Sequence, residues 1–330
     1  MISALHHRGG HVRLRVLWVR GCASILTLGS GGSGGREGPT MQMGGAVGAA
    51  VASLLRIGPR ERRILYVAGV AAGMAAVFRT PLGAALLAVE VLYRDDFEAE
   101  ALIPSVLASV VAYSVASTLF GETTLFGHLS PFHFHVGHLP LYALMALGVA
   151  LSAAVFASIL HGIQTVFERL PVPGWMKPAL GGLALGALAV PMIAEIGPWM
   201  MGGPGRGLGL LGGSYGAIQV ALTGAPWLPA DWSSVGILLV LAALKLVASA
   251  LTIGSGGSAG DFAPSLILGG LIGGAFGHAA ALLTGDPSLQ PGAFTLVGMA
   301  TFYGGIAHAP LSAMVIVCEL AGSYDLLVPL

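Results

Sequence analysis

The residues best placed to do chemistry lie in two glycine-rich segments that each lead into a proline. Residues 29–40 read GSGGSGGREGPT, and residues 254–265 read GSGGSAGDFAPS, so the two segments match at an offset of 225. Glycines leave the backbone open to a ligand, and Pro39 and Pro264 suit the first turn of a following helix. The start of a helix exposes unpaired N–H groups with partial positive charge. Two such starts near each other predict a binding site for an anion.

Glu37 lies at the first of these helix starts, within Arg36-Glu37-Gly38-Pro39. A carboxylate there can occupy the anion site itself, so moving or protonating it would open the path. The alternative is an ordinary first-turn carboxylate with Arg36 as its partner. The equivalent position in the second segment is Phe262, so only one half carries this acidic group. Backbone dipoles bind an anion weakly enough to release it, so no lysine or arginine is needed at the ion.

A second internal match shows that the repeat extends beyond the glycine-rich segments. Residues 80–91 read TPLGAALLAVEV and residues 309–320 read APLSAMVIVCEL, which pairs Glu90 with Glu319. Several uncharged runs are too short, or too rich in glycine and proline, to cross a bilayer as simple helices. We therefore expect an all-α polytopic membrane protein with two repeats in inverted topology, in which broken and re-entrant helices meet at a central site.

The composition excludes most other classes of protein. The 330 residues are 55% hydrophobic and 9% charged, with 51 glycines and a formal net charge of +0. A soluble domain has about 25% charged residues, so a soluble enzyme is excluded, and no basic surface for nucleic acid is expected. The two cysteines, Cys22 and Cys318, are interpreted as small buried hydrophobic residues. No cofactor is expected.

The chain is expected to divide into a basic, irregular N-terminal segment at 1–20 and one transmembrane domain at 21–330. The repeat halves are predicted at about 21–120 and 139–330. By the positive-inside rule, the arginines at 56, 60, 62 and 63 place their loop in the cytoplasm. Small-residue spacing predicts close helix packing at these glycines: Gly69 and Gly73, Gly182 and Gly186, and Gly269, Gly273 and Gly277.

Two other motifs in the sequence are typical of different functions. Residues 29–34 satisfy G-x-G-x-x-G, but no strand–helix–strand unit surrounds them, so dinucleotide binding is rejected. A histidine cluster could share a metal or sense pH. It is better read as a solvated loop, because no cysteine or carboxylate is interleaved with its members, His128, His133, His135 and His138.

At residues 35–39 (GREGP) and 260–264 (GDFAP) the sequence resembles the CLC family of voltage-gated chloride channels and chloride/proton exchangers. The resemblance runs from about Trp18 to Leu330. It implies a multi-pass protein of the cell membrane, a homodimer that uses helices such as 81–91 and 310–320, and chloride as the transported ligand. It makes Glu37 the gating glutamate. The implied anion-binding residues are Gly35, Arg36, Gly38, Gly260, Asp261, Phe262 and Ala263.

The sequence departs from the family pattern in three ways. Neither the family's GSGIP-type turn nor its later tyrosine helix is found, so the chain resembles a fragment. Asp261 stands where the family usually has an apolar residue. Val91 stands where exchangers commonly carry a second glutamate, which favours a passive channel over proton-coupled exchange. Glu90 could relay protons instead, or could simply be a helix-end carboxylate near Arg94. A rival hypothesis is that the truncated chain conducts nothing and is a gene remnant or an assembly partner.

Overall fold

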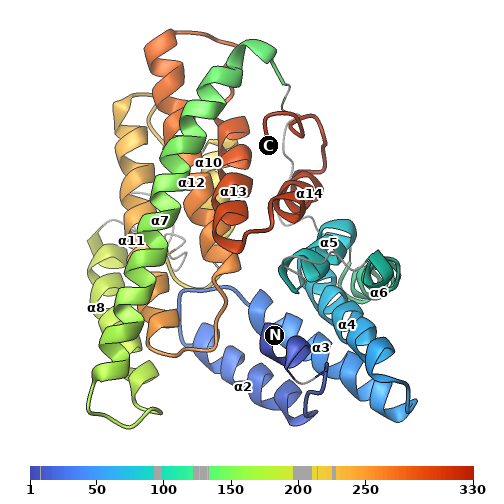
Figure 1. The fold of residues 1–330 in the computed structure, drawn as a ribbon. Helices are drawn as coiled ribbons and strands as arrows, with labels where there is room; N and C mark the ends of the chain where they lie inside the picture. Colours follow the sequence, from blue (N-terminus) through green and yellow to red (C-terminus); the bar gives the residue numbers. More distant parts are fainter. Residues whose placement is uncertain are drawn as a thin grey trace.

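In the computed structural model, the described residues form helices joined by short connections (Figure 1). The structure describes residues 1–7, 9–92, 99–121, 126, 132, 134–195, 210–213, 215–224 and 228–330. The helices of the first part are α1 (Ile2–His6), α2 (Arg15–Gly29), α3 (Glu37–Leu54), α4 (Pro59–Phe78), α5 (Pro81–Leu92) and α6 (Ala99–Phe120). Those that follow are η1 (Val136–His138), α7 (Leu139–Arg169), α8 (Lys177–Glu195), α10 (Tyr215–Thr223), α11 (Trp232–Gly254), α12 (Phe262–Thr284), α13 (Pro291–Ala307) and α14 (Pro310–Ala321).

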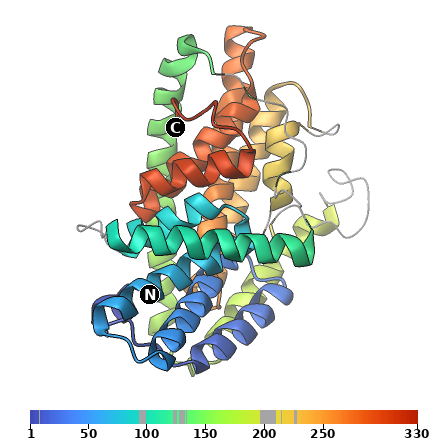
Figure 2. The same ribbon diagram turned by 90° about the vertical axis from the view of Figure 1, so that its right-hand side faces the viewer.

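Four helical segments in the described part are long and apolar enough to cross a membrane: residues 100–120, 136–169, 232–254 and 262–284. The first two face outward over most of their length, and apolar side chains such as Ile103 and Leu147 are 69% and 71% exposed. Figure 2 shows α6 lying across the outside of the molecule. In contrast, α5 and α14 have 12 residues each and are too short to span a bilayer, as the sequence predicts. The outward apolar faces are suited to lipid.

The two halves fold through matching local features. Prolines stand at the first position of α5 and α14, where their missing N–H has no role in the helix. The preceding helices α4 and α13 are followed by Arg79 and His308, which adopt left-handed φ values of 59° and 52°. Such values are uncommon outside glycine. Both halves therefore use the same sharp turn to redirect the chain into a short helix.

In each half, the two helices with the most extensive contact approach each other at glycines. A methyl group on Gly44 would overlap the carbonyl of Gly69, and one on Gly269 would overlap the carbonyl of Gly298. These contacts join α3 to α4 and α12 to α13. The predicted packing at Gly69 and Gly269, and at their neighbours Gly73, Gly273 and Gly277, is confirmed. The prediction for Gly182 and Gly186 was wrong, because open space lies beside both of them.

Contacts between the two glycine-rich segments are reciprocal. The N–H of Ser33 donates to the hydroxyl of Thr252 at 2.9 Å, and the N–H of Ser258 donates to the hydroxyl of Thr27 at 3.1 Å. Each residue is replaced by its counterpart when the repeat offset is applied. Such an exchange is what a two-fold relation between the halves produces, and it agrees with the inverted topology expected from the sequence.

The N-terminal segment and the cysteines differ from expectation. Residues 1–20 were expected to be irregular, but they include α1 and the first turns of α2. The apolar face of α2 continues back past residue 20, so the arginines there do not end the helix. Cys22 is exposed on α2, whereas Cys318 is buried. The expectation of burial was therefore wrong for Cys22.

The described histidines of the 121–140 segment hold the start of α7. His128 and His133 lie outside the described residues. His135 packs edge-on against His138, and His138 Nε2 lies 3.2 Å from the Asp286 carboxylate. Hydrogen bonds from Ser288 and His138 lower the pKa of Asp286 to about 2. Among the described residues no group of three or more histidine, cysteine or acidic side chains could hold a metal ion.

Candidate functional site

The two glycine-rich segments meet in the interior and pair through their backbones. The N–H of Gly35 donates to the carbonyl of Gly260 at 2.8 Å, and the N–H of Gly260 donates back at 2.7 Å. A Cβ on Gly260 would stand 3.0 Å from the nitrogen of Gly38, so a side chain there would push the segments apart. The starts of α3 and α12 are thereby held next to each other. We call the N–H groups at these two helix starts the anion cradle.

Glu37 lies at this cradle with its side chain fully buried. Its Oε1 accepts a hydrogen bond of 2.6 Å from the hydroxyl of Tyr215, the first residue of α10. Its Oε2 has no hydrogen-bond partner in the described part of the chain, and it lies where a methyl group on Gly35 would be. The carboxylate therefore folds back over its own helix start.

Arg36 does not pair with Glu37. The side chain of Arg36 is exposed, and no ion pair joins it to a carboxylate among the described residues. The alternative of a first-turn carboxylate paired with Arg36 is thus not what the structure shows. The partner of Glu37 is Tyr215, which the sequence analysis did not identify. Its only signal in the sequence is a tyrosine that opens a largely apolar segment, GAIQVAL.

Aromatic rings from four helices form a wall beside the cradle. Phe262 packs edge-on against Phe78 at 4.8 Å and against Tyr303 at 4.4 Å between ring centroids. Phe78 also contacts Tyr215 at 6.2 Å. Tyr303 is 6% exposed, and its hydroxyl has no hydrogen-bond partner among the described residues. The carboxylates that act on it electrostatically are those of Asp261, Glu37 and Glu90. Tyr303 was also missed by the sequence analysis.

Asp261 precedes α12 and does not cap it through its side chain. Its backbone carbonyl accepts from the N–H of Ser265 at 2.9 Å, as the first helical turn requires. The residue is exposed, although the helix start that it precedes is buried. Its position next to Phe262 puts a second carboxylate near the anion cradle.

A buried lysine lies behind the cradle, contrary to the expectation of a scaffold without cations. Lys245 of α11 is 1% exposed, and its Nζ donates to the hydroxyl of Ser33 at 2.8 Å. It also donates to the carbonyls of Leu210 and Gly212 at 3.4 and 3.3 Å. The ammonium group acts electrostatically on Glu37. In the sequence, Lys245 is a single charge within the otherwise uncharged run 235–253, and nothing there points to this role.

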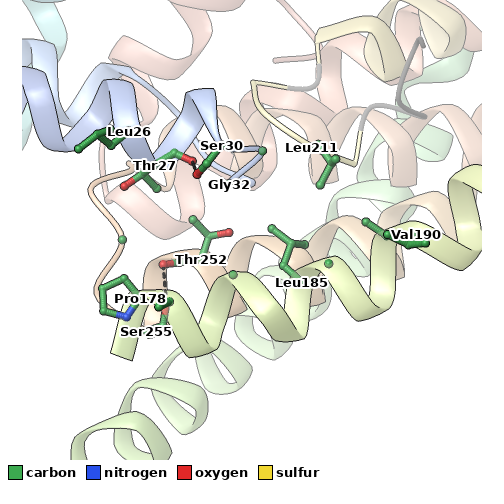
Figure 3. Close-up of a pocket in the computed structure, with 16 residues that line it drawn as sticks. Leu26, Thr27, Ser30, Gly32, Pro178, Leu185, Val190, Leu211, Thr252 and Ser255 are labelled. Carbon is green, nitrogen blue, oxygen red and sulfur yellow. Dashed lines mark hydrogen bonds between the residues drawn. The ribbon is translucent and has the colours of Figure 1, made fainter. Parts of the chain in front are cut away.

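A pocket of about 360 Å³ lies beside the glycine-rich segments (Figure 3). The end of α2 contributes Thr27, α11 contributes Thr252, and α8 lines the opposite wall. Gly182 and Gly186 face this space, which explains why they make no close helix contact. Glu37 does not line the pocket, so it is separate from the anion cradle.

Glu90 and Glu319 bind the starts of each other's helices. The carboxylate of Glu90 accepts from the N–H groups of Leu311 and Ser312, at 3.2 and 2.8 Å, and from the hydroxyl of Ser312. The carboxylate of Glu319 accepts from the N–H groups of Leu82 and Gly83, at 3.0 and 2.8 Å. Neither contact involves Arg94, which lies outside the described residues. We call this arrangement the carboxylate clasp, since it ties α5 to α14.

Breaking the clasp is expected to destabilise the fold. Glu90→Gln and Glu319→Gln each replace a charged acceptor, and hydrogen bonds to charged groups contribute about 1.5–3 kcal/mol. Each change should lower the free energy of unfolding in mixed detergent micelles by about that amount, measured by tryptophan fluorescence. The control is Glu61→Gln, at an exposed carboxylate, which should change it by less than about 0.5 kcal/mol. If the three variants had equal free energies of unfolding, the carboxylate clasp would not contribute to the stability of the fold.

The apolar spans, the short helices and the internal site together define an integral membrane protein that crosses the bilayer several times. This confirms the all-α polytopic fold predicted from the sequence. The family described as voltage gated chloride channel matches residues 1–330, and the chain belongs to that family. The resemblance stated from residues 35–39 and 260–264 is therefore confirmed.

The proteins to which this chain is similar are described as exchange transporters or antiporters. The "H(+)/Cl(-) exchange transporter ClcA" of Salmonella typhi is 33% identical over 321 residues, which are 96% of this chain and 63% of that protein. Its counterpart in Salmonella typhimurium matches equally well. The crystal structure of a slow cyanobacterial Cl⁻/H⁺ antiporter superposes with a TM-score of 0.81 at 22% identity. The match covers 97% of this chain and 71% of the antiporter chain. A CLC-type fluoride/proton antiporter has a TM-score of 0.75 at 25% identity, with 97% and 77% covered.

This chain spans 63% of the length of the curated relatives that it matches. The fold is shared, and the family is established. The passive conduction that Val91 favours is less well supported than proton-coupled exchange, because the similar curated proteins are described as exchange transporters.

Proposed function

We propose that the chain forms the anion pathway of a proton-coupled chloride transporter, with Glu37 as its gate. The observation that carries the proposal is the position of the Glu37 carboxylate at the start of α3, where a helix start favours negative charge. One of its oxygens is bound by Tyr215, and the other has no hydrogen-bond partner in the described part. A chloride ion and this carboxylate compete for the same positive end of the helix.

Proton coupling follows from that competition. A carboxylate that takes up a proton loses the charge that holds it at the helix start, so it can leave and admit an anion. When the anion leaves, the ionised carboxylate returns. In this way Glu37 exchanges a proton for an anion in one cycle. A carboxylate with one oxygen free of hydrogen bonds can accept the proton there without first breaking a bond.

The proposed anion ligands are the backbone N–H groups of the two helix starts and one side-chain hydroxyl. The N–H groups belong to residues 35–38 and 260–263, as the family resemblance implies. The hydroxyl of Tyr303 is proposed as the side-chain donor, because its ring packs on Phe262 and its hydroxyl has no partner among the described residues. Asp261 bears a charge that opposes an anion, so it is proposed to act only when protonated.

Glu90 is proposed to serve the clasp rather than a proton path. Both of its oxygens accept hydrogen bonds from the start of α14, so a proton there would disrupt those bonds. The homodimer expected from the resemblance, with α5 and α14 at the interface, stays a prediction. Leu82 and Leu311 on these helices are 44% and 57% exposed, which suits either a partner subunit or lipid.

The experiment that tests the function is chloride-driven proton movement. The chain is reconstituted into liposomes loaded with chloride and diluted into chloride-free buffer, with the membrane potential clamped by potassium and valinomycin. The inside and outside start at the same pH. If the chain is an exchanger, chloride efflux drives protons into the liposomes, and a pH electrode in the external buffer records their uptake. Protein-free liposomes with a chloride ionophore are the control. Chloride flux without proton movement would support the passive channel, and no chloride flux would support a non-conducting chain.

A further inference from the structure

A basic groove lies at the N-terminal end of the molecule, away from the anion cradle. It has a volume of about 570 Å³ and is lined by the N-terminal segment, the first turns of α2, and residues of α3 and α4. We call it the basic groove and define it by its polar side chains: His11, Arg13, Arg15, Arg20, Gln42 and Tyr66. No acidic side chain is among the residues that line it.

The arginines of the groove are not neutralised by acidic partners. Arg13, Arg15 and Arg20 are exposed, and none of them makes an ion pair with a carboxylate among the described residues. By contrast, Arg60 outside the groove pairs with Glu100 at 2.5 Å. Three guanidinium groups around one cavity repel one another unless an anion binds between them. Guanidinium groups match the geometry of phosphate oxygens with two parallel hydrogen bonds.

The groove also contains an uncharged hydrogen-bond donor, the hydroxyl of Tyr66, so it is more than a cluster of surface charges. The residue is 2% exposed, and its ring packs where a side chain on Gly45 would be. It nevertheless lines the groove, and its hydroxyl has no hydrogen-bond partner in the described part of the chain. Buried tyrosine hydroxyls usually find a partner. A ligand oxygen in the groove would satisfy this one.

The surroundings of the groove place it at a membrane surface. Three apolar residues, Leu14, Trp18 and Val19, lie between Arg13 and Arg20 in the sequence. Their side chains are 51%, 70% and 63% exposed. Exposed apolar and tryptophan side chains next to arginines are typical of the boundary between acyl chains and headgroups. Gly10 lies against the backbone of Arg62 in α4, so the groove adjoins the arginines at 56, 60, 62 and 63. The positive-inside rule assigns that end to the cytoplasm.

We propose that the basic groove binds the phosphate headgroup of an anionic phospholipid from the cytoplasmic leaflet. The arginines hold the phosphate, and the Tyr66 hydroxyl donates to one of its oxygens. The exposed apolar side chains of α2 pack along the acyl chains. This site does not depend on the proposed transport activity, because its ligand is not transported. A free phosphate ion offers the same oxygens, so the experiment must separate the two sources.

The test measures the dissociation constant of headgroup-labelled phosphatidylglycerol for the purified chain in neutral detergent, at fixed ionic strength. Each arginine near an anionic lipid surface contributes about 1 kcal/mol, so Arg15→Gln combined with Arg20→Gln should weaken binding about 30-fold. The matched control is Arg56→Gln combined with Arg63→Gln, which removes the same charge outside the groove. It should change binding by less than about 3-fold. Equal losses in both pairs would mean general surface attraction and would overturn the proposal.

Tyr66→Phe keeps the charge and the ring, so it tests the built site. It should weaken phosphatidylglycerol binding about 10-fold, because it removes one hydrogen bond to a charged group. Phosphatidylcholine and inorganic phosphate are the competitors. Displacement by inorganic phosphate with an affinity matching that of the lipid would assign the groove to a soluble phosphate and overturn the lipid source. Unchanged binding by Tyr66→Phe would overturn the role of its hydroxyl. Size-exclusion profiles confirm that each variant is folded.

Discussion

Glu37→Gln is expected to abolish proton-coupled transport while leaving an open path for chloride. Glutamine has the shape of a protonated glutamate but cannot ionise, so it cannot return to the anion cradle as a charged competitor. Proton movement driven by chloride should fall at least about 100-fold, the lower range for the loss of a proton-transferring side chain. Chloride efflux should become independent of pH, because glutamine does not titrate. The measurement is paired chloride and pH recording on reconstituted liposomes.

Tyr215→Phe provides the matched control for the position of the gate. It removes the hydroxyl that donates to Glu37 at 2.6 Å but keeps the carboxylate and the ring contact with Phe78. Proton coupling should persist, and chloride turnover should rise about 10-fold, because one hydrogen bond to a charged group no longer holds the gate. Tyr142→Phe, whose ring stacks on Phe294 far along the sequence from the gate, should change neither quantity. A pH-dependent Glu37→Gln variant would contradict the assignment of Glu37 as the gate.

The second large effect is expected at the glycine contacts within each half. Gly44→Ala places a methyl group against the carbonyl of Gly69, and Gly269→Ala does the same at Gly298. Backbone cannot move aside as a flexible side chain can, so α3 must shift from α4, and α12 from α13. Overpacking of this kind costs about 1–3 kcal/mol. The free energy of unfolding in mixed micelles should fall by that amount in both variants, as measured by tryptophan fluorescence.

Gly182→Ala is the control for the glycine contacts. Open space surrounds Gly182, so the added methyl group meets no atom, and alanine favours the helix by up to about 1 kcal/mol. The stability of this variant should stay the same or rise. If Gly44→Ala were as stable as Gly182→Ala, the close approach of α3 and α4 would not depend on glycine.

The repeat was readable from the sequence because both copies must solve the same local problem. A glycine-rich turn followed by proline is required wherever the backbone approaches another segment and then starts a helix. The pairing of Gly35 with Gly260 and the clasp of Glu90 and Glu319 use positions that match between the two copies. The identity of the partner residues was not readable, because matched positions show equivalence but not contact.

The sequence misjudged residues whose roles depend on distant neighbours. Lys245 looked like a single charge in an apolar helix, yet Ser33, 212 residues earlier, accepts its hydrogen bond. Gly182 and Gly186 have the spacing of a packing motif, but no atom of the described residues lies within 4 Å of a Cβ at either of them. Residues 1–20 looked irregular because their arginines break the apolar pattern, although Arg15 and Arg20 are exposed on α2 and leave its helix contacts to other residues.

By itself, the sequence determined the class of protein, the duplicated helix starts and the acidic residue at one of them. Composition and local motifs decide these features, since the bilayer excludes charge and a helix start is built from adjacent residues. Only the tertiary structure decided which side chains face Glu37. Tyr215 lies 178 residues away along the chain, and the wall of Phe78, Phe262 and Tyr303 comes from three further helices. Packing between helices sets those contacts, and no local pattern encodes it.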